Sequence, residues 1–274
     1  MAARVMDLIE EAGIDAREAR MLLAAASGMG TALLAAFPER EIDQAAGRRF
    51  AALARRRREG VPIAYILGRR EFYSRSFVVT PDVLIPRPET ELLVELALAR
   101  ITPDRGEVSV LDLGTGSGVV AISIACEAEL ARVTGIDASA EALAVARGNA
   151  QRLASDQELT FVQSDWFSAL GVARYDLIVG NPPYVAAEDD HLAQGDLRFE
   201  PTAALASGPA GLDAITTICT QAPQHLKPGA WLLLEHGYDQ GAAVRALLAA
   251  AGLTEATTWP DLAGLDRVSG ARAA

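Results

Sequence analysis

Apolar residues recur at helical spacing through the first 60 residues of the chain. The earliest ones fall three or four positions apart, at Val5, Leu8, Ile9 and Ala12. Gly13 ends this first pattern, and the same spacing continues over residues 19–26 and 44–58. The spacing is typical of amphipathic helices. We therefore expect a small helical domain, which we place at residues 1–75.

The pattern changes between residues 62 and 88, where β-branched and aromatic residues become frequent. Two short runs, 71–73 and 76–79, predict a β-hairpin joined through Ser74 and Arg75. The proline-rich run 84–91 follows, and it predicts a stiff extended segment ahead of a helix that begins near Thr90. We take residues 76–90 as a hairpin and linker between two domains.

Residues 91–274 alternate between short apolar runs and helical patterns. The strands are expected at 108–113, 132–137, 159–163, 174–180, 229–236, 253–258 and 265–271. The helices are expected at 118–130, 139–153, 212–225 and 239–251. Strands separated by helices predict an α/β domain with parallel strands and right-handed crossovers. The loop before the last strand is too short for a helix, so this strand should run antiparallel, at or near the edge of the sheet.

Composition limits the class of protein. The chain has 274 residues and is 50% hydrophobic, enough for one large core or for one domain with a smaller companion. No apolar run approaches the roughly 20 residues that span a bilayer, and the acidic residues within the first apolar pattern do not fit a signal peptide. Cys126 and Cys219 stand in apolar surroundings and suggest buried thiols in a reducing compartment. We expect a cytoplasmic protein without a metal site, because neither the cysteines nor the three histidines have ligand spacing.

Charge argues against a nucleic-acid substrate. The formal net charge is −11 and the pI is near 4.8, whereas proteins that bind duplexes depend on Lys and Arg to neutralise phosphates. The basic run Arg55–Arg58 is most simply a helix end that complements the macrodipole. Contact with ribosomal RNA or with a partner is the alternative.

A glycine-rich turn follows the first strand of the α/β region. Gly114, Thr115, Gly116, Ser117 and Gly118 connect this strand to a helix. Glycines let a ligand approach the backbone closely, and a helix N-terminus offers free N–H groups. Dinucleotide-binding proteins use G-x-G-x-x-G, but the glycines here alternate with single residues. A glycine loop alone leaves a dinucleotide-binding fold in play, and this spacing argues against it.

The next two strand ends carry acidic residues. Asp137 can accept hydrogen bonds from ribose hydroxyls, or it can cap the following helix; both roles are compatible if Ser139 provides the cap. Asp165 can accept from an adenine amino group, and Trp166 can stack on or flank the ring, although core packing is the alternative for this indole. The arrangement resembles the seven-stranded, Rossmann-like fold of S-adenosylmethionine-dependent methyltransferases.

The segment Asn181–Tyr184 follows an apolar run that reads as a buried strand. Pro182 and Pro183 stiffen the backbone and remove two N–H donors, so the carbonyls of Asn181 and Pro182 can point outward as acceptors. Such an edge suits an –NH2 group that is held by both hydrogens. A proline-rich turn with Tyr184 packed at its rim is the bland alternative.

With these motifs in order, the chain resembles the release factor glutamine methyltransferases, the PrmC/HemK family. The most specific matching segments are 62–68, Leu84–Glu91, Arg198–Pro201 and Leu233–Gly237. The resemblance implies S-adenosyl-L-methionine as cofactor and the glutamine of the Gly-Gly-Gln loop of class I peptide chain release factors as substrate. It also implies that Asn181 lies beside the transferred methyl group, that Asn181–Tyr184 hold the substrate glutamine, and that the helical domain docks the release factor.

A carboxamide nitrogen is a weak nucleophile with protons that are hard to remove, so we expect catalysis by positioning and no strong general base near Asn181. Three alternatives stay open. The substrate could be a glutamine of a ribosomal protein, or an adenine amino group of nucleic acid, and the chain could be a cofactor-binding scaffold without turnover. The acidic composition disfavours nucleic acid, and no direct DNA binding and no membrane contact are expected; a ribosomal context is possible.

Overall fold

The computed structural model describes residues 3–102 and 106–274. These fall into two compact units. The first comprises the described residues up to Arg69 together with Ala193–Phe199, and the second comprises Arg70–Leu192 and Glu200–Ala274. We call them the N-terminal unit and the sheet unit. The domain boundaries expected at residues 75 and 90 stay predictions.

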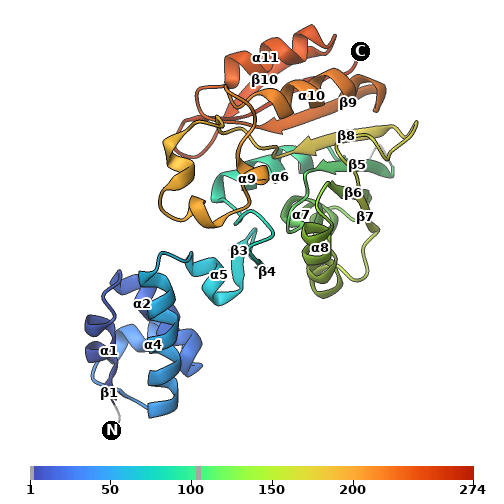
Figure 1. The fold of residues 1–274 in the computed structure, drawn as a ribbon. Coiled ribbons are helices and arrows are strands. Elements are labelled where there is room, and N and C mark those ends of the chain that lie inside the picture. Colours follow the sequence, from blue (N-terminus) through green and yellow to red (C-terminus); the bar gives the residue numbers. More distant parts are fainter. Residues whose placement is uncertain (1–2, 103–105) are drawn as a thin grey trace. The chain divides into compact units, whose positions relative to one another are not determined.

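The N-terminal unit is built from short helices, as the apolar spacing predicts (Figure 1). Its helices are α1 (Val5–Glu11), α2 (Ala16–Ser27), α3 (Thr31–Ala36), α4 (Gln44–Arg58) and α5 (Ile63–Leu67), with the short strands β1 (Ala3–Arg4) and β2 (Glu41–Ile42) and the 3-10 turn η4 (Leu197–Phe199). Asp15 caps α2 and Asp43 caps α4 through backbone N–H groups. α3 and α5 lie outside the three predicted helices, because each is too short to show a period.

The basic run at the end of α4 is partly structural. The Arg57 guanidinium donates to Glu18 at 2.7 Å and to Asp196 at 2.7 Å, which fixes the segment 193–199 to the helices of the N-terminal unit. Arg58 donates to the Ala12 carbonyl at 2.6 Å. Three of the four arginines therefore have partners within the N-terminal unit, since Arg55 also pairs with Glu59 at 4.0 Å. The solvated helix end expected from the sequence is thus only part of the role of this run.

A hairpin of β3 (Arg69–Phe72) and β4 (Arg75–Val78) follows. Its turn is formed by Tyr73 and Ser74, which have φ of 46° and 57°, as a two-residue hairpin turn requires. The predicted turn at Ser74–Arg75 is therefore wrong by one residue. Arg75 belongs to the strand, where its guanidinium reaches Glu127 at 2.6 Å.

The sheet unit contains one seven-stranded sheet with the order β10-β11-β9-β8-β5-β6-β7. Its strands are β5 (Val108–Leu113), β6 (Ala131–Asp137), β7 (Leu159–Gln163), β8 (Tyr175–Gly180), β9 (Leu226–Glu235), β10 (Thr254–Pro260) and β11 (Asp266–Arg272). All seven predicted strands are confirmed, with ends that shift by a few residues. The first five run parallel, and β11 lies antiparallel between β9 and β10, as the short final loop predicts.

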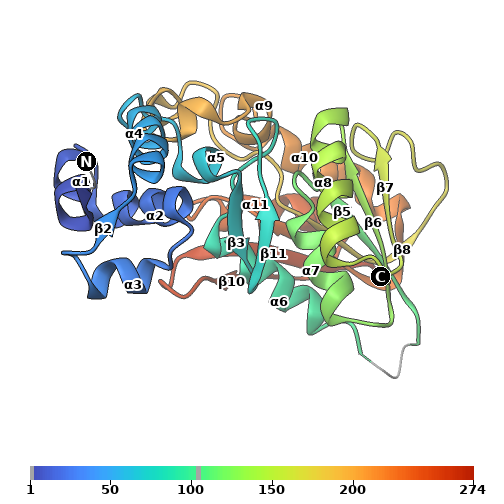
Figure 2. The ribbon, with the colours of Figure 1, turned by 90° about the horizontal axis from the view of Figure 1, so that it is seen from below.

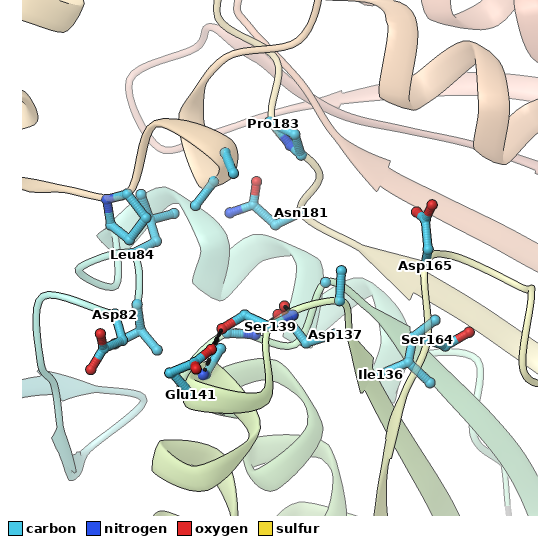
Figure 3. A pocket seen from close by; sticks show the side chains of 18 of the residues that line it. Asp82, Leu84, Ile136, Asp137, Ser139, Glu141, Ser164, Asp165, Asn181 and Pro183 are labelled. Carbon is cyan, nitrogen blue, oxygen red and sulfur yellow. Dashed lines mark hydrogen bonds between the residues drawn. The ribbon is translucent and has the colours of Figure 1, made fainter.

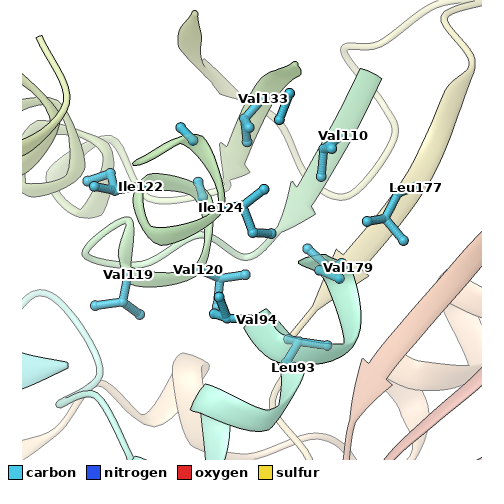
Figure 4. Close-up of a cluster of buried hydrophobic side chains, with 14 of the residues drawn as sticks. Leu93, Val94, Val110, Val119, Val120, Ile122, Ile124, Val133, Leu177 and Val179 are labelled. Carbon is cyan, nitrogen blue, oxygen red and sulfur yellow. The ribbon is translucent and has the colours of Figure 1, made fainter. Parts of the chain in front are cut away.

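Helices cover both faces of this sheet. Side chains alternate along each strand, so Val110 and Leu111 enter two different apolar clusters. One face packs against α6 (Glu91–Leu98), α7 (Val119–Glu127) and α8 (Ala140–Leu153), as Figures 2 and 4 show. The other face packs against α10 (Asp213–Gln221) and α11 (Gly241–Ala250). The remaining short elements are η1 (Pro88–Thr90), η3 (Asp190–Ala193), α9 (Thr202–Leu205) and η5 (Ala222–Gln224).

The chain order creates a switch point in the sheet. From β5 the chain moves to β6 and β7 on one side, whereas β8 pairs with the other side of β5. Ligands of open α/β sheets bind at such a point, outside the carboxyl ends of the strands. Among the helices of the described residues, none has the length and apolar character to cross a membrane.

Candidate functional site

A cavity of about 490 Å³ opens at the carboxyl ends of β5, β6, β7 and β8 (Figure 3). Residues from all four strand ends contribute to it, and the rest of the wall comes from the segment after the hairpin, from the start of α8 and from α9. The lining residues are Pro81, Asp82, Val83, Leu84, Gly114, Gly116, Ile136, Asp137, Ala138, Ser139, Glu141, Ala142, Ser164, Asp165, Trp166, Asn181, Pro183, Pro201, Ala203 and Ala204.

The glycine turn forms the floor of the cavity at the end of β5. Gly114 and Gly116 line the cavity in the left-handed backbone region, with φ of 66° and 54°. Gly118 is also left-handed, and a Cβ there would lie 2.8 Å from Ile122 Cδ1. Thr115, Ser117 and Gly118 belong to the turn but do not line the cavity, so they contribute to the conformation of the turn.

A buried carboxylate supports this turn. Asp112 accepts from the Thr115 hydroxyl at 2.6 Å and from the Ala121 backbone N–H at 3.2 Å. Because it is buried, the pKa of Asp112 is raised to about 7. The turn is therefore held by a group that titrates near neutrality.

Asp137 joins the first two strand ends. One of its carboxylate oxygens accepts from the Gly116 N–H at 2.9 Å, and the other accepts from the Ser139 N–H at 2.9 Å. The Ser139 hydroxyl accepts from the Ala142 N–H and caps α8. The prediction that Ser139 provides the helix cap is thus confirmed, and the ribose contact of Asp137 stays a prediction. Each carboxylate oxygen keeps capacity for one more donor.

Trp166 has a strained backbone, with φ of 47°. Ser164 stabilises this conformation because its hydroxyl donates to the Trp166 carbonyl at 2.6 Å and accepts from the Ala169 N–H at 3.0 Å. The indole reaches the glycine turn, where its Cζ3 would lie 3.9 Å from a Cβ on Gly114. Asp165 and Trp166 both line the cavity.

The cavity is acidic. Four carboxylates line it, Asp82, Asp137, Glu141 and Asp165, and among the described residues no Lys or Arg does so. A pyrophosphate would meet repulsion here. A cationic ligand with hydroxyl and amino donors fits this set of acceptors.

Asn181 projects into the cavity beside Pro183 (Figure 3). Its amide nitrogen Nδ2 donates to the Thr90 hydroxyl at 3.1 Å. This contact occupies the donor side of the amide and leaves the acceptor Oδ1 for a ligand. Pro182 is buried and does not line the cavity.

Tyr184 lies off the cavity. Its hydroxyl donates to Glu235 Oε1 at 3.2 Å, and burial together with that carboxylate raises the pKa of the phenol. The Tyr184 carbonyl accepts from Gln240 Nε2 at 3.0 Å. The expected contact of Tyr184 with the substrate glutamine stays a prediction. In the structure, Tyr184 fixes the end of the motif to β9.

Sequence reasoning missed three supporting residues. Glu235 is 0% exposed, and burial raises its pKa to about 7, so a carboxylate with a near-neutral pKa does lie near the motif. The Glu200 carboxylate accepts from the Ile85 N–H at 2.9 Å and from Arg87, which holds two walls of the cavity together. Glu235 and Glu200 both belong to segments that carry the family resemblance. The position of Glu235 at the end of a strand next to β8 could have marked it as a residue near the site.

The third is Asn149, which is fully buried. Its amide bonds the N–H and the carbonyl of Val78 at 2.8 and 3.0 Å, and it also donates to the Ser117 carbonyl at 2.9 Å. Asn149 thereby ties the hairpin to the glycine turn. No local sequence signal distinguishes it from an ordinary polar residue of a helix.

Two family descriptions match this chain. Residues 89–208 match the family description of the methyltransferase small domain, and residues 3–68 match that of the PrmC N-terminal domain. A methyltransferase structure from Pyrococcus furiosus superposes with a TM-score of 0.54 at 16% identity, over 73% of this chain and 90% of that chain, which shows a shared fold.

Sequence relatives cover nearly the whole chain. A release factor glutamine methyltransferase from Bordetella pertussis is 50% identical over 96% of this chain and 97% of its own length. One from Pseudomonas aeruginosa is 50% identical over 92% of this chain and 90% of its own length. Identity at this level over this length establishes common descent and a common fold. The chain is therefore an enzyme of the release factor glutamine methyltransferase family.

Proposed function

We propose that this enzyme transfers the methyl group of S-adenosyl-L-methionine to the side-chain amide nitrogen of the Gly-Gly-Gln glutamine in class I peptide chain release factors, and that Asn181 positions that amide. Family membership sets the reaction class. The observation that carries the role of Asn181 is its bond to Thr90, which leaves an amide oxygen free at the cavity.

The cavity suits the cofactor. Asp137 can accept from ribose hydroxyls, and Asp165 with Trp166 can hold the adenine, since all three line the same cavity. The glycine turn, from Gly114 to Gly118, lets the methionine end approach the backbone. The acidic lining favours a sulfonium, and when bound this group supplies an electrophilic methyl.

Substrate positioning then falls to the motif after β8. Asn181 Oδ1 and the Pro182 carbonyl would accept the two N–H bonds of the glutamine amide, while Pro183 keeps the backbone rigid. Tyr184 would add packing against the amide plane from its anchored position. Holding two reactants in line is worth up to about 7–11 kcal/mol of barrier in ideal cases, so positioning alone can supply most of the rate.

The test is Asn181→Ala, measured as labelled methyl transfer to a purified release factor with titration calorimetry of the cofactor alongside. Transfer should fall by at least about a hundredfold while cofactor affinity changes less than threefold, because the lost oxygen serves the substrate. Unchanged turnover would refute the role of Asn181.

Two other substrates predict different label patterns. A ribosomal-protein glutamine would be labelled in total ribosomal protein, and an adenine amino group would be labelled in nucleic acid. A cofactor-binding scaffold would label nothing. The net charge of −11 disfavours nucleic acid, and the relatives named above are all described as acting on release factors.

The N-terminal unit is proposed to dock the release factor. Three large apolar side chains of this unit, Met6, Leu33 and Phe37, are 44%, 36% and 48% exposed. Met6 and Phe37 belong to one local surface, because the Met6 N–H donates to the Pro38 carbonyl at 2.8 Å. Exposed apolar side chains gathered in this way are typical of interaction sites. The Gly-Gly-Gln tripeptide alone offers little area, so we expect the whole factor to be needed.

A further inference from the structure

Two loops of the sheet unit present large apolar side chains to solvent. The first loop, residues 236–240, follows β9, and the second loop, residues 261–265, joins β10 to β11. Tyr238 of the first loop is 64% exposed, and in the second loop Leu262 is fully exposed and Leu265 is 46% exposed. We call these three side chains the apolar edge. Single exposed apolar residues are ordinary, whereas several on adjoining loops are typical of an interaction site.

Hydrogen bonds join the two loops. The His236 N–H donates to the Arg267 carbonyl at 2.9 Å, which extends the pairing of β9 with β11 by one residue. The Arg267 guanidinium donates to the His236 carbonyl at 3.4 Å and to the Asp261 carboxylate at 3.3 Å. The two loops therefore adjoin each other, and their apolar side chains belong to one local surface.

The second loop is well ordered although its leucines are exposed. The Asp261 carboxylate accepts from the Ala263 N–H at 2.9 Å and from the Leu265 N–H at 3.1 Å. The Asp261 N–H donates to the Leu265 carbonyl at 2.8 Å, and the Gly264 N–H donates to the Asp261 carbonyl at 2.9 Å. A loop that is already fixed in this way loses little conformational freedom when a partner binds to it.

The first loop is bonded directly to the end of the substrate motif. Gln240 Nε2 donates to the Tyr184 carbonyl at 3.0 Å, and Gln240 Oε1 accepts from the Gly237 N–H at 2.8 Å. Tyr238 is therefore next to a residue whose position is tied to Asn181–Tyr184.

The second loop lies on the same side of the sheet as the motif. β8 and β9 run parallel, β11 runs antiparallel to β9, and β10 runs antiparallel to β11, so the loop between β10 and β11 meets the carboxyl ends of β8 and β9. Because neighbouring strands lie about 4.8 Å apart, this loop is roughly 10–15 Å from the end of the motif.

We propose that the apolar edge docks the release factor by receiving an apolar face beside its Gly-Gly-Gln loop. This inference rests on the function proposed above, because it takes the release factor as the substrate. A glutamine side chain is short, so the protein that carries it has to cover the surface around Asn181. A standard interface buries about 800 Å² on each partner, which is a disc of about 16 Å radius. Such a disc centred on the motif reaches both loops of the apolar edge.

The experiment measures KM and kcat with purified release factor for Tyr238→Ser, Leu262→Ser and the double variant. Each single change should raise KM about fivefold and the double change about twenty-fivefold, as expected for apolar residues at the centre of an interface. The kcat at saturating factor and the cofactor dissociation constant should stay within about twofold of wild type, because neither residue lines the cavity.

Docking is also measured without turnover. Calorimetry with a release factor whose loop glutamine is changed to alanine reports binding alone. The double variant should bind this factor about twenty-fivefold more weakly than wild type does. The melting temperature of the variants should equal that of wild type, because both side chains are exposed.

Two kinds of control accompany these variants. Tyr238→Phe and Leu262→Met keep the apolar area and should hold KM within about twofold of wild type. Val172→Ser removes an apolar side chain that is 96% exposed but lies before the amino end of β8, at the opposite end of the strand from the motif. It should leave KM unchanged.

Wild-type KM and wild-type affinity in the double variant would overturn the proposal, and so would an equal rise of KM in Val172→Ser. If ultracentrifugation shows a wild-type dimer that the double variant converts to a monomer with KM unchanged, the apolar edge instead binds a second copy of the chain. Failure of wild type to methylate the factor would refute the proposed function, whereas the binding measurement would still decide whether the apolar edge docks the factor.

Discussion

The amide of Asn181 donates to the hydroxyl of Thr90 at 3.1 Å, although the two residues are 91 positions apart in the chain. The bond joins the loop after β8 to the turn that precedes α6. A side chain held in this way loses little further freedom when substrate binds, which is the condition for catalysis by positioning. The rest of the site has the same character, since backbone N–H groups and buried carboxylates hold its parts in place.

Replacement of Asp137 by Ala should weaken cofactor binding by at least about tenfold. The carboxylate holds the N–H groups of Gly116 and Ser139, and it is the proposed acceptor for ribose, so two functions are lost together. Calorimetry with S-adenosylmethionine measures the effect. Asp82→Ala, which removes another cavity carboxylate without backbone contacts to the glycine turn, serves as the control and should change affinity less. Equal affinity in Asp137→Ala and wild type would contradict the assignment.

Two glycine substitutions should have opposite effects on stability. Gly118→Ala places a Cβ 2.8 Å from Ile122 Cδ1 at a φ of 83°, so it should destabilise the fold by about 1–3 kcal/mol and weaken cofactor binding. Gly148 lies exposed within α8, and a Cβ added there would meet no atom within 4 Å. Gly148→Ala should stabilise by about 0.5–1 kcal/mol. Urea denaturation measures both, and the same sign for the two variants would contradict the account.

Stability should depend on pH through two buried acids. The pKa of Asp112 and that of Glu235 are each raised to about 7, because burial disfavours the charged form. The folded state therefore holds these protons more tightly than the unfolded chain does. Their stabilising contribution is complete below the unfolded pKa, near 4, and is lost as pH rises through about 7.

Glu235→Gln isolates this effect. The free energy of unfolding of the variant, relative to wild type, should increase between pH 5 and pH 8 by an amount on the order of 3 kcal/mol. Exposed Glu107 is the control, since its pKa is lowered by Arg132 and Glu107→Gln should show no trend in this interval. A flat difference for Glu235→Gln would mean that the carboxylate titrates as an ordinary glutamate.

Replacement of Phe37 by Ser should raise the KM for release factor by about tenfold while kcat and cofactor affinity stay near wild type. Phe37 is 48% exposed, so its loss should cost little fold stability, whereas a buried aromatic contact with a partner is worth more. Val172 of the sheet unit is 96% exposed, and Val172→Ser is the control. An unchanged KM would remove this part of the N-terminal unit from the docking surface.

The sequence was sufficient for the regular parts of the fold. The strands of the sheet are recognisable as short apolar runs, and helices α7 and α8 as longer periodic patterns. The order of these elements along the chain and the antiparallel direction of the last strand could therefore be predicted. The short helices α3 and α5 could not, because fewer than two turns show no period. The hairpin turn at Tyr73 and Ser74 was misplaced by one residue, because neither residue type commonly adopts the positive φ that both have here.

The site was predictable where the chain order alone brings residues together. Gly114, Asp137, Asp165 and Asn181 lie at or just after the carboxyl ends of parallel strands, and they line one cavity. The hydrogen bonds of Glu235, Glu200 and Asn149 are made with residues far away in the sequence. Such long-range pairs cannot be inferred from a single sequence. The expectation that no strong general base acts near Asn181 stays a prediction, and the structure adds that the buried Glu235 bonds the end of the motif through Tyr184.

The most direct measurement is transfer of labelled methyl from S-adenosylmethionine to purified release factor, beside the same factor with its Gly-Gly-Gln glutamine changed to alanine. The account predicts label on the first factor and none on the second. Label on both factors, or label that appears only in ribosomal protein or nucleic acid, would contradict it.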